Sequence, residues 1–520
     1  MTRSPRGPRA IRRPLSALAL LVAGALTLSG CLYSQIPREA GGPCVAEPEV
    51  GADVAADLRP FYEQQIDWTD CGAGFEKATV TAPLDWSDPE AGEIELAIVR
   101  QPATGGEPLG SLLVNPGGPG RGGVDFIAET IDFAVSEELQ ENYDIIGFDP
   151  RGVGGSTAVR CLDAPAMDEF LYSVPENRRD TPEWERELEE RNTRFAEACE
   201  ANSGGVLEFI TTEQSARDMD LLRGVLGDEK LTYLGYSYGT FLGATYAKLF
   251  PDRVGRLVLD GAIDPSVSGT DVGTTQALGF ERALRTYMGS CLAAEGCPFD
   301  GTVDQAMADL AALLAAVDRA PIPAADGREL GADTLMTTII AALYAEVNWP
   351  YLTEALTGVL QGDPATAFML ADFYNGRENG QYADNSTEAF HAYNCMDYPL
   401  DETQEELDAA DALIAREAPT IAPYWSGPGL CEVWPFEPTG VREPIAAEGA
   451  PPIVVIGTTG DPATPYEWAV SLADQLSSGV MMTFEGEGHT AYNGQSECID
   501  RAVDAFFVDG TVPQDGLTCR

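Results

Sequence analysis

The chain is poor in basic residues. Its 520 residues include 32 Lys and Arg against 83 Asp and Glu, which gives a formal net charge of −51 at pH 7. Lysine is especially scarce and occurs only as Lys77, Lys230 and Lys248. A surface with this excess of acid repels nucleic acid and anionic membranes, so we expect neither as a direct partner. The charge alone does not indicate a substrate.

Histidine is nearly absent, and the cysteines lack the spacing of metal sites. The chain has only His391 and His489, and none of its 11 cysteines forms a CxxC pair. We therefore expect no metal site. Ten cysteines remain when Cys31 is set aside, an even number suited to five disulfides in an oxidising compartment. Although sequence alone does not establish connectivity, we expect neighbours to bond. The neighbouring pairs are Cys44 and Cys71, Cys161 and Cys199, Cys291 and Cys297, Cys395 and Cys431, and Cys498 and Cys519.

Only one long apolar run is present, near the start. Residues 1–14 carry five arginines and no acid, and the run LSALALLVAGALTL follows at 15–28. This length suits a signal-peptide core better than a membrane span. The run ends in LSGC, which resembles the lipobox of bacterial lipoproteins and implies that Cys31 is lipidated. We expect a signal peptide over 1–30 and an extracytoplasmic protein held at the cell membrane only by its lipid. An ordinary signal peptide with an incidental cysteine is the alternative.

The rest of the chain alternates between strand-like and helix-like segments. Residues 31–60 are rich in Gly, Pro and Ala and indicate a tether. Segments 61–265 and 446–520 contain short apolar runs alternating with helices, which predict a mostly parallel sheet with helices on both faces. Segment 266–445 is dominated by helical patterns without a convincing strand, and predicts a large helical cap. The expected strands are 77–84, 93–100, 110–117, 143–150, 230–237, 255–261, 451–461 and 480–486, and the clearest helices are 213–226, 238–250, 303–318, 466–477 and 497–507.

The pentapeptide from Gly235 to Gly239 matches the pattern GxSxG. It lies where a strand ends and a helix begins, as the nucleophile elbow of a serine hydrolase requires. The dipole of the following helix favours developing negative charge beside the serine. The sequence thus predicts Ser237 as a nucleophile. A structural Gly-Ser turn is the alternative.

A serine nucleophile needs a base and an acid that orients the base. His489 lies in a loop after the last strand-like run and is the expected base, whereas His391 is expected to be a packing or capping residue. Asp461 follows strand 451–461 and gives the chain order Ser, Asp, His that this arrangement requires. Asp260 is the rival acid, and a capping or turn aspartate is the alternative for both. Such a site needs no metal or organic cofactor.

Acyl transfer also needs hydrogen-bond donors for the oxyanion. One donor is expected to be the backbone N–H of Tyr238, directly after the serine. The second is expected in the glycine-rich segment 115–120, which follows strand 110–117, and Gly118 is the preferred residue. Paired glycines there permit positive φ and expose backbone N–H groups. A plain Gly-Pro turn is the alternative.

Five motifs together resemble a known family. They are PGGPG at 116–120, FDPRGVGGS at 148–156, GYSYGT at 235–240, GDPATP at 460–465 and GEGH at 486–489. They are similar to the proline iminopeptidase-related enzymes of the α/β-hydrolase fold, and most of all to secreted tripeptidyl aminopeptidases of actinobacteria. Cytoplasmic relatives usually have His where Pro116 stands. The resemblance implies a serine exopeptidase that releases short peptides, tripeptides above all, from free N-termini. The loop 149–152 recurs in the family, and we interpret it as structural support for the site.

Two other functions fit the same residues. A carboxylesterase or lipase would use the same triad on a different substrate. A catalytically inactive lipoprotein that binds peptides would need no catalytic triad. The presence of nucleophile, acid and base in the required order therefore argues against this function. The sequence does not indicate the oligomeric state.

Overall fold

The computed structural model describes residues 48–51, 54–425, 427 and 429–520. The predicted signal peptide, Cys31 and Cys44 lie outside the described residues, as does most of the predicted tether. Within the described ranges, no helix combines the length and apolar character needed to cross a bilayer.

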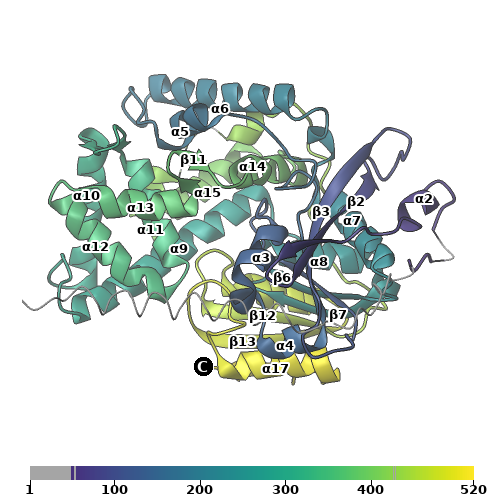
Figure 1. The fold of residues 1–520 in the computed structure, drawn as a ribbon. Coiled ribbons are helices and arrows are strands. Elements are labelled where there is room, and N and C mark those ends of the chain that lie inside the picture. The colour runs from purple at the N-terminus through teal and green to yellow at the C-terminus, as the bar shows by residue number, and fades with distance from the viewer. Residues whose placement is uncertain (1–47, 52–53, 426, 428) are drawn as a thin grey trace, which may run out of the picture. The chain divides into compact units, whose positions relative to one another are not determined.

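A ten-stranded sheet organises the chain, in the order β1-β2-β3-β5-β4-β6-β7-β12-β13-β14 (Figure 1). The strands from β5 to β14 are parallel, whereas β1, β2 and β3 pair antiparallel at one edge. The strand bounds are β1 Thr69–Gly72, β2 Phe75–Pro83, β3 Glu93–Gln101, β4 Ser111–Asn115, β5 Asp144–Phe148, β6 Leu231–Tyr236, β7 Val254–Asp260, β12 Ile453–Gly460, β13 Gly479–Glu487 and β14 Leu517–Cys519. This is the α/β-hydrolase fold predicted from the sequence.

Helices cover both faces of the sheet because alternate side chains of each buried strand point to opposite faces. Leu113 of β4 packs in the core formed with α7, α8 and α16. Its neighbour Leu112 packs in the core formed with α3, α4 and α17. The bounds are α2 Arg59–Tyr62, α3 Gly123–Ala134, α4 Glu137–Asn142, α7 Thr212–Val225, α8 Tyr238–Leu249, α16 Tyr466–Gln475 and α17 Glu497–Asp509, with short 3-10 turns at Leu207–Phe209 and Pro251–Arg253.

The chain between β7 and β12 is mainly helical, and most of it packs in a core of its own. It also contains two small hairpins, β8 with β9 and β10 with β11, which the sequence did not predict. The bounds are α9 Gly269–Ala293, α10 Val303–Arg319, β8 Ile322–Pro323, β9 Glu329–Leu330, α11 Ala332–Leu343, α12 Trp349–Leu360, α13 Ala365–Tyr374, β10 Arg377–Glu378, β11 Gln381–Tyr382, α14 Ser386–Asp397 and α15 Gln404–Glu417, with 3-10 turns at Glu346–Asn348, Ala422–Tyr424 and Leu430–Val433.

Two parts of the chain depart from the simple division into core and cap. Helix α14 belongs to the predicted cap segment, yet its buried residues Ala389, Ala392 and Tyr393 join the core of the sheet. Helices α5 (Ala164–Tyr172) and α6 (Pro182–Asn202) belong to the predicted core segment, yet their rings pack on His391 of α14. The helical layer above the sheet in Figure 1 is thus built from two separate stretches of sequence.

Four disulfides join sequence neighbours as expected. The bridges are Cys161–Cys199, Cys291–Cys297, Cys395–Cys431 and Cys498–Cys519. Cys71 forms no disulfide with a described residue, and its expected partner Cys44 lies outside the described ranges. Four bridges suggest an extracytoplasmic location, since cytosolic thiols are kept reduced.

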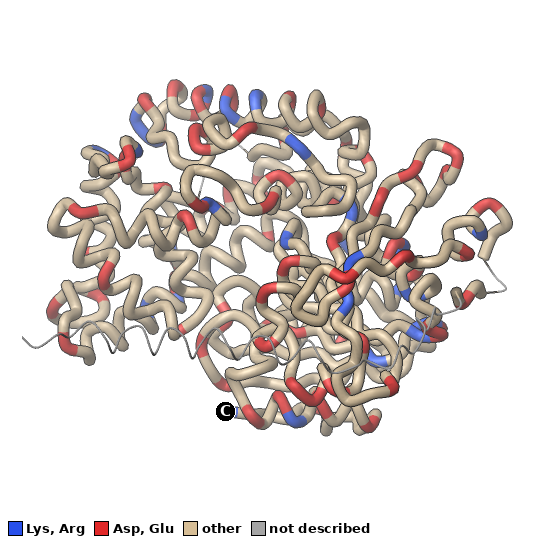
Figure 2. The backbone as a smooth tube through the Cα atoms, viewed as in Figure 1, with Lys and Arg blue, Asp and Glu red and all other residues tan. Residues whose placement is uncertain are grey.

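The acidic residues are spread over the described chain. Figure 2 shows Asp and Glu along the sheet core and the helical insertion alike, with no single acidic tract. The negative charge is therefore distributed along the described chain rather than concentrated in one segment.

Candidate active site

Ser237 occupies a strained turn between β6 and α8. Its φ of 54° and ψ of −123° fall where non-glycine residues are rare, and such conformations cost about 1–3 kcal/mol. A Cβ at Gly235 would lie 2.4 Å from the carbonyl oxygen of Gly239, and one at Gly239 would lie 2.8 Å from Asn115 Oδ1. These contacts explain both glycines of the pentapeptide. The Ser237 N–H donates to the Asp260 carbonyl at 2.8 Å, which ties the turn to β7.

His489 and Asp461 are joined directly. His489 Nδ1 lies 2.8 Å from Asp461 Oδ2 and 3.0 Å from Oδ1. The carboxylate is fixed by the N–H groups of Ala463 and Thr464, each 2.9 Å from Oδ1. The hydroxyl of Thr464 donates to Oδ2 at 2.9 Å. The sequence analysis did not identify Thr464, although its place three residues after Asp461 in GDPATP is typical of a side chain that closes a turn around a carboxylate.

The second ring nitrogen of His489, Nε2, is available to accept a proton. His489 Nε2 is buried and has no hydrogen-bond partner among the described residues. The imidazole is 10% exposed and meets the ring of Tyr344 edge-on, with ring centroids 5.3 Å apart. Burial lowers the pKa of His489, but the charge of Asp461 and its hydrogen bond outweigh burial and raise that pKa above its ordinary value. A buried nitrogen without a partner is costly, and such atoms are typical of reactive sites.

The raised pKa predicts the pH dependence of activity. Only neutral histidine accepts a proton, so kcat/KM should fall as the pH drops through the pKa of His489 in the free enzyme. We expect this acidic limb above the ordinary histidine pKa of about 6.5. The measurement is kcat/KM from pH 5 to 9 in buffers of constant ionic strength. A profile that stays flat down to pH 5 would contradict His489 as the base.

Asp260, the rival acid, lies close by but faces a different group. Its carboxylate is fully buried and accepts hydrogen bonds from the N–H groups of Ala491, at 3.0 Å, and Tyr492, at 2.8 Å. Burial raises the pKa of Asp260 to about 6, although these N–H groups oppose the rise. Asp260 thus holds the loop after His489, whereas Asp461 accepts the hydrogen bond from the imidazole Nδ1.

The glycine-rich loop after β4 lies against the serine turn. A Cβ at Gly117 would be 2.8 Å from Ser237 Cβ, so only glycine fits there. The Gly117 N–H donates to Asn115 Oδ1 at 2.9 Å. The N–H groups of Gly118 and Tyr238 donate no hydrogen bond to any described residue. Both expected oxyanion donors are thus unengaged.

The loop 149–152 and His391, both considered in the sequence analysis, contribute to packing and support. Arg151 is fully buried, and its Nε and Nη2 lie 2.8 and 2.7 Å from the two carboxylate oxygens of Asp218. His391 packs among three rings at centroid distances of 5.9, 5.5 and 5.5 Å, and burial lowers its pKa to about 4. Arg151 therefore supports the loop 149–152, and His391 is a packing residue as expected.

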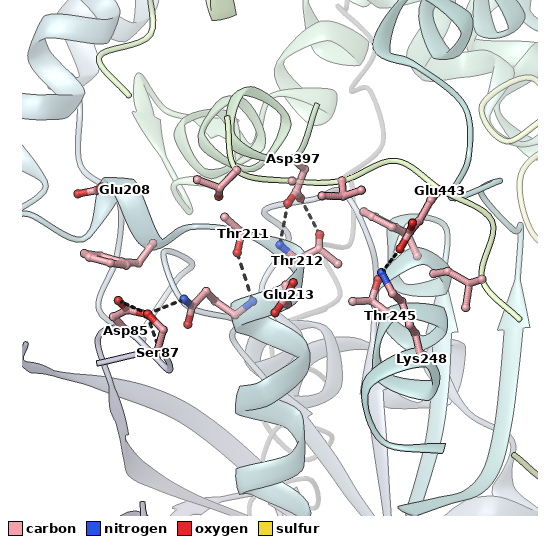
Figure 3. Close-up of a pocket in the computed structure, with 17 residues that line it drawn as sticks. Asp85, Ser87, Glu208, Thr211, Thr212, Glu213, Thr245, Lys248, Asp397 and Glu443 are labelled. Atoms are coloured by element: carbon pink, nitrogen blue, oxygen red, sulfur yellow. Dashed lines mark hydrogen bonds and ion pairs between the residues drawn. The ribbon is translucent and has the colours of Figure 1, made fainter. Parts of the chain in front are cut away.

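Two further observations concern other kinds of site. The described residues contain no group of three or more His, Cys, Asp or Glu side chains that could hold a metal ion. Figure 3 shows a recess between α7, α8 and the segment 439–445, whose acidic lining includes Asp397 and Glu443. Ser237, Asp461 and His489 do not line this recess.

Three curated relatives resemble the chain over nearly its full length. The Serine protease Hip1 of Mycobacterium tuberculosis is 34% identical over 98% of each chain. The Carboxylesterase B of M. tuberculosis is 37% identical over 98% of each chain. The Tripeptidyl aminopeptidase of Streptomyces lividans is 29% identical over 96% of this chain and 95% of the relative.

A family model described as TAP-like protein matches residues 418–519, the part that carries Asp461 and His489. The full-length relatives extend the relationship to the serine turn and the glycine-rich loop. The chain therefore belongs to the TAP-like family of α/β hydrolases and is a serine hydrolase.

Proposed function

We propose that the protein is a serine exopeptidase in which Ser237, His489 and Asp461 form the catalytic triad. The observation that carries the proposal is the hydrogen bond from His489 Nδ1 to Asp461, which leaves the buried Nε2 without a partner. In the reaction, Ser237 Oγ attacks the substrate carbonyl while Nε2 accepts the hydroxyl proton. Asp461 stabilises the imidazolium that forms.

The remaining steps follow from the same groups. The tetrahedral oxyanion accepts hydrogen bonds from the N–H groups of Tyr238 and Gly118, which are otherwise unused. His489 then protonates the leaving amine, the C–N bond breaks, and an acyl-enzyme ester remains on Ser237. Water, deprotonated by His489, attacks this ester and releases the new carboxylate.

Contacts of the insertion support cleavage near a chain end. The backbone N–H of His489 donates to the Tyr344 carbonyl at 2.8 Å, so the segment after α11 lies directly against His489. A Cβ at Gly120 would be 2.6 Å from the Ser386 carbonyl, so α14 lies on the glycine-rich loop. Because the insertion contacts both sides of the site, it leaves little room for a substrate polypeptide to pass through. The proposed substrate is therefore a peptide with a free N-terminus, from which tripeptides are released.

A free α-amino group needs an anionic partner in a dry site. Glu487 is two residues from His489 and half-buried. Burial raises its pKa, and the charge of Glu346, from the insertion, raises it further. Neither carboxylate forms an ion pair with a described cation. A bound ammonium group would relieve this repulsion, so we assign Glu487 to the substrate amino group.

The test compares matched tetrapeptides with free and acetylated N-termini. We expect the free peptide to be cleaved and the acetylated one to be refused, because the acetylated nitrogen is neutral. Glu487→Gln should raise KM for the free peptide about tenfold or more, with a smaller effect on kcat. The matched control is Glu485→Gln, since Glu485 is exposed and pairs with Arg520. Equal cleavage of both peptides, or cuts inside a long protein, would defeat the exopeptidase proposal.

A carboxylesterase activity is the second candidate. The relative with 37% identity over 98% of the chain is called Carboxylesterase B, which favours esters as substrates. The same Ser237 chemistry would act, but without selection for an ammonium group. Purified enzyme assayed on a tripeptide p-nitroanilide and on short-chain p-nitrophenyl esters separates the two. An esterase should prefer the esters in kcat/KM far beyond their greater chemical reactivity, and Glu487→Gln should leave it unchanged.

We also propose that the mature protein begins at a lipidated Cys31. The support is the LSGC sequence after an apolar run, together with disulfides typical of extracytoplasmic proteins. Mass spectrometry of protein from a bacterial membrane fraction should find a diacylglyceryl cysteine at the N-terminus. Cys31→Ala should release soluble protein with unchanged kcat. An unmodified N-terminus at another residue would reject the lipid anchor.

A further inference from the structure

Helix α14 connects the insertion to the catalytic turn. At its start, Asn385 Nδ2 donates to the carbonyls of Gly152 and Val159, both at 2.8 Å. Near its end, Cys395 is bonded to Cys431. The helix is therefore anchored at both ends, and its last residue, Asp397, is 4% exposed.

Asp397 begins a chain of hydrogen bonds that reaches the residue after the nucleophile. Thr212, the first residue of α7, donates its N–H to Asp397 Oδ1 at 2.9 Å and its hydroxyl to Oδ2 at 2.6 Å (Figure 3). The Thr212 hydroxyl also lies 2.5 Å from the phenolic oxygen of Tyr238. All three groups are buried, and Tyr238 is the first residue of α8.

The direction of these hydrogen bonds follows from proton counting. Thr212 has one hydroxyl proton, which is donated to the carboxylate, so the Tyr238 phenol must donate to Thr212. Burial raises the pKa of Tyr238 well above its ordinary value, so the phenol keeps its proton. Burial raises the pKa of Asp397 to about 6, although the hydrogen bonds from Thr212 oppose the rise. At pH 7 to 8 the Tyr238 phenol therefore donates to the Thr212 hydroxyl, which in turn donates to the ionised Asp397 carboxylate.

The strained serine turn needs such support. A residue with the φ and ψ of Ser237 persists only when its surroundings hold it. On one side, the Ser237 N–H is held by the Asp260 carbonyl. On the other side, the next residue is Tyr238, whose ring packs against Phe241 and Tyr393 and whose phenol is fixed by Thr212.

We propose that Asp397, acting through Thr212, is a positioning residue that holds Tyr238 so that its backbone N–H points at the oxyanion. This inference rests on the proposed role of Tyr238 in the oxyanion hole. It gives the insertion a second part in the reaction, because α14 then sets the geometry of the catalytic turn as well as covering it. An error in this geometry lowers the rate of acyl transfer while leaving ground-state binding intact.

The test uses p-nitrophenyl acetate, so it does not depend on whether peptides or esters are the natural substrate. Tyr238→Phe removes only the phenol hydroxyl and with it the donated hydrogen bond, and Thr212→Val removes the hydroxyl in the middle of the hydrogen-bond chain. We expect either change to lower kcat about tenfold with KM within about twofold, because small misplacements of catalytic groups are costly. Affinity for an alkyl boronic acid, whose adduct with serine is tetrahedral, should fall by the same factor. Thr212→Ser keeps the hydroxyl and should restore wild-type values.

Tyr393→Phe is the matched control. It removes a buried phenol hydroxyl beside the same ring, but the Tyr393 hydroxyl bonds to Ser215 and to the Arg151 carbonyl rather than to Thr212. We expect its kcat and boronate affinity to equal those of the wild type. The positioning role is wrong if Tyr238→Phe and Thr212→Val keep wild-type kcat, or if Tyr393→Phe loses as much as they do. A wrong triad assignment would give a different result, because Ser237→Ala would then keep its activity.

Discussion

Ser237→Ala is expected to lower kcat by roughly 10⁵–10⁶-fold, because the members of a catalytic triad act as a unit and removal of the nucleophile removes the acyl-enzyme route. The turn should keep its shape, since both glycines remain and the Ser237 N–H bond to the Asp260 carbonyl involves only backbone. The measurement is kcat on a tripeptide p-nitroanilide and on p-nitrophenyl acetate, together with covalent labelling by a fluorophosphonate.

Ser471→Ala serves as the control for this substitution. The Ser471 hydroxyl accepts a hydrogen bond from Gln475 at 3.0 Å on helix α16 and takes no part in the site. It should be labelled and should turn over substrate like the wild type. If Ser237→Ala kept more than a few per cent of the activity, or were still labelled, the nucleophile would be another residue.

Asp461→Asn is expected to lower kcat about 10⁴-fold. An asparagine keeps the shape but loses the charge that stabilises the imidazolium, and its amide favours the wrong tautomer of His489. Asp260→Asn, the matched exchange at the rival position, should act differently. It weakens the hydrogen bonds to the Ala491 and Tyr492 N–H groups, so we expect a stability loss of about 1–3 kcal/mol and a much smaller fall in kcat.

The roles of Asp461 and Asp260 are distinguished by measuring kcat and the free energy of unfolding for both variants. The acidic limb of the pH profile is a further readout. In Asp461→Asn the limb should move to lower pH, because the charge that raises the pKa of His489 is gone. A larger loss of kcat in Asp260→Asn than in Asp461→Asn would make Asp260 the catalytic acid.

The strands and helices that the sequence predicted well share strong local signals. The predicted strand 230–237 and helix 238–250 correspond to β6 at Leu231–Tyr236 and α8 at Tyr238–Leu249. Most of their apolar residues are buried, and the glycines mark the turn between them. The missed strand β1 at Thr69–Gly72 is exposed at all four positions and has no apolar pattern to detect. Strand β14 is only three residues long.

The candidate site shows a different limit of prediction from sequence. Ser237 and His489 stand out because the GxSxG pattern lies between a strand and a helix and because histidine is rare. Asp260 and Asp461 both lie at the ends of buried strands, so the sequence favoured Asp461 but its pattern could not exclude Asp260. The distinction comes from the direction in which each carboxylate faces, which depends on the turn that Thr464 closes. Helix α14 was assigned to the cap, and its contact with the catalytic turn depends on Thr212 and Tyr238, which are far from it in sequence.

The position of the insertion also affects how the protein is made. Strands β7 and β12 are neighbours in the sheet, with Leu257 opposite Ile453, yet the whole insertion separates them along the chain. When β7 leaves the ribosome or the export channel, its apolar edge has no partner until the last part of the chain follows. Unpaired edges of this kind recruit other chains, and distant pairing is slow. A chain that ends within the insertion is therefore expected to aggregate rather than fold, because the sheet can close only once the complete polypeptide is present.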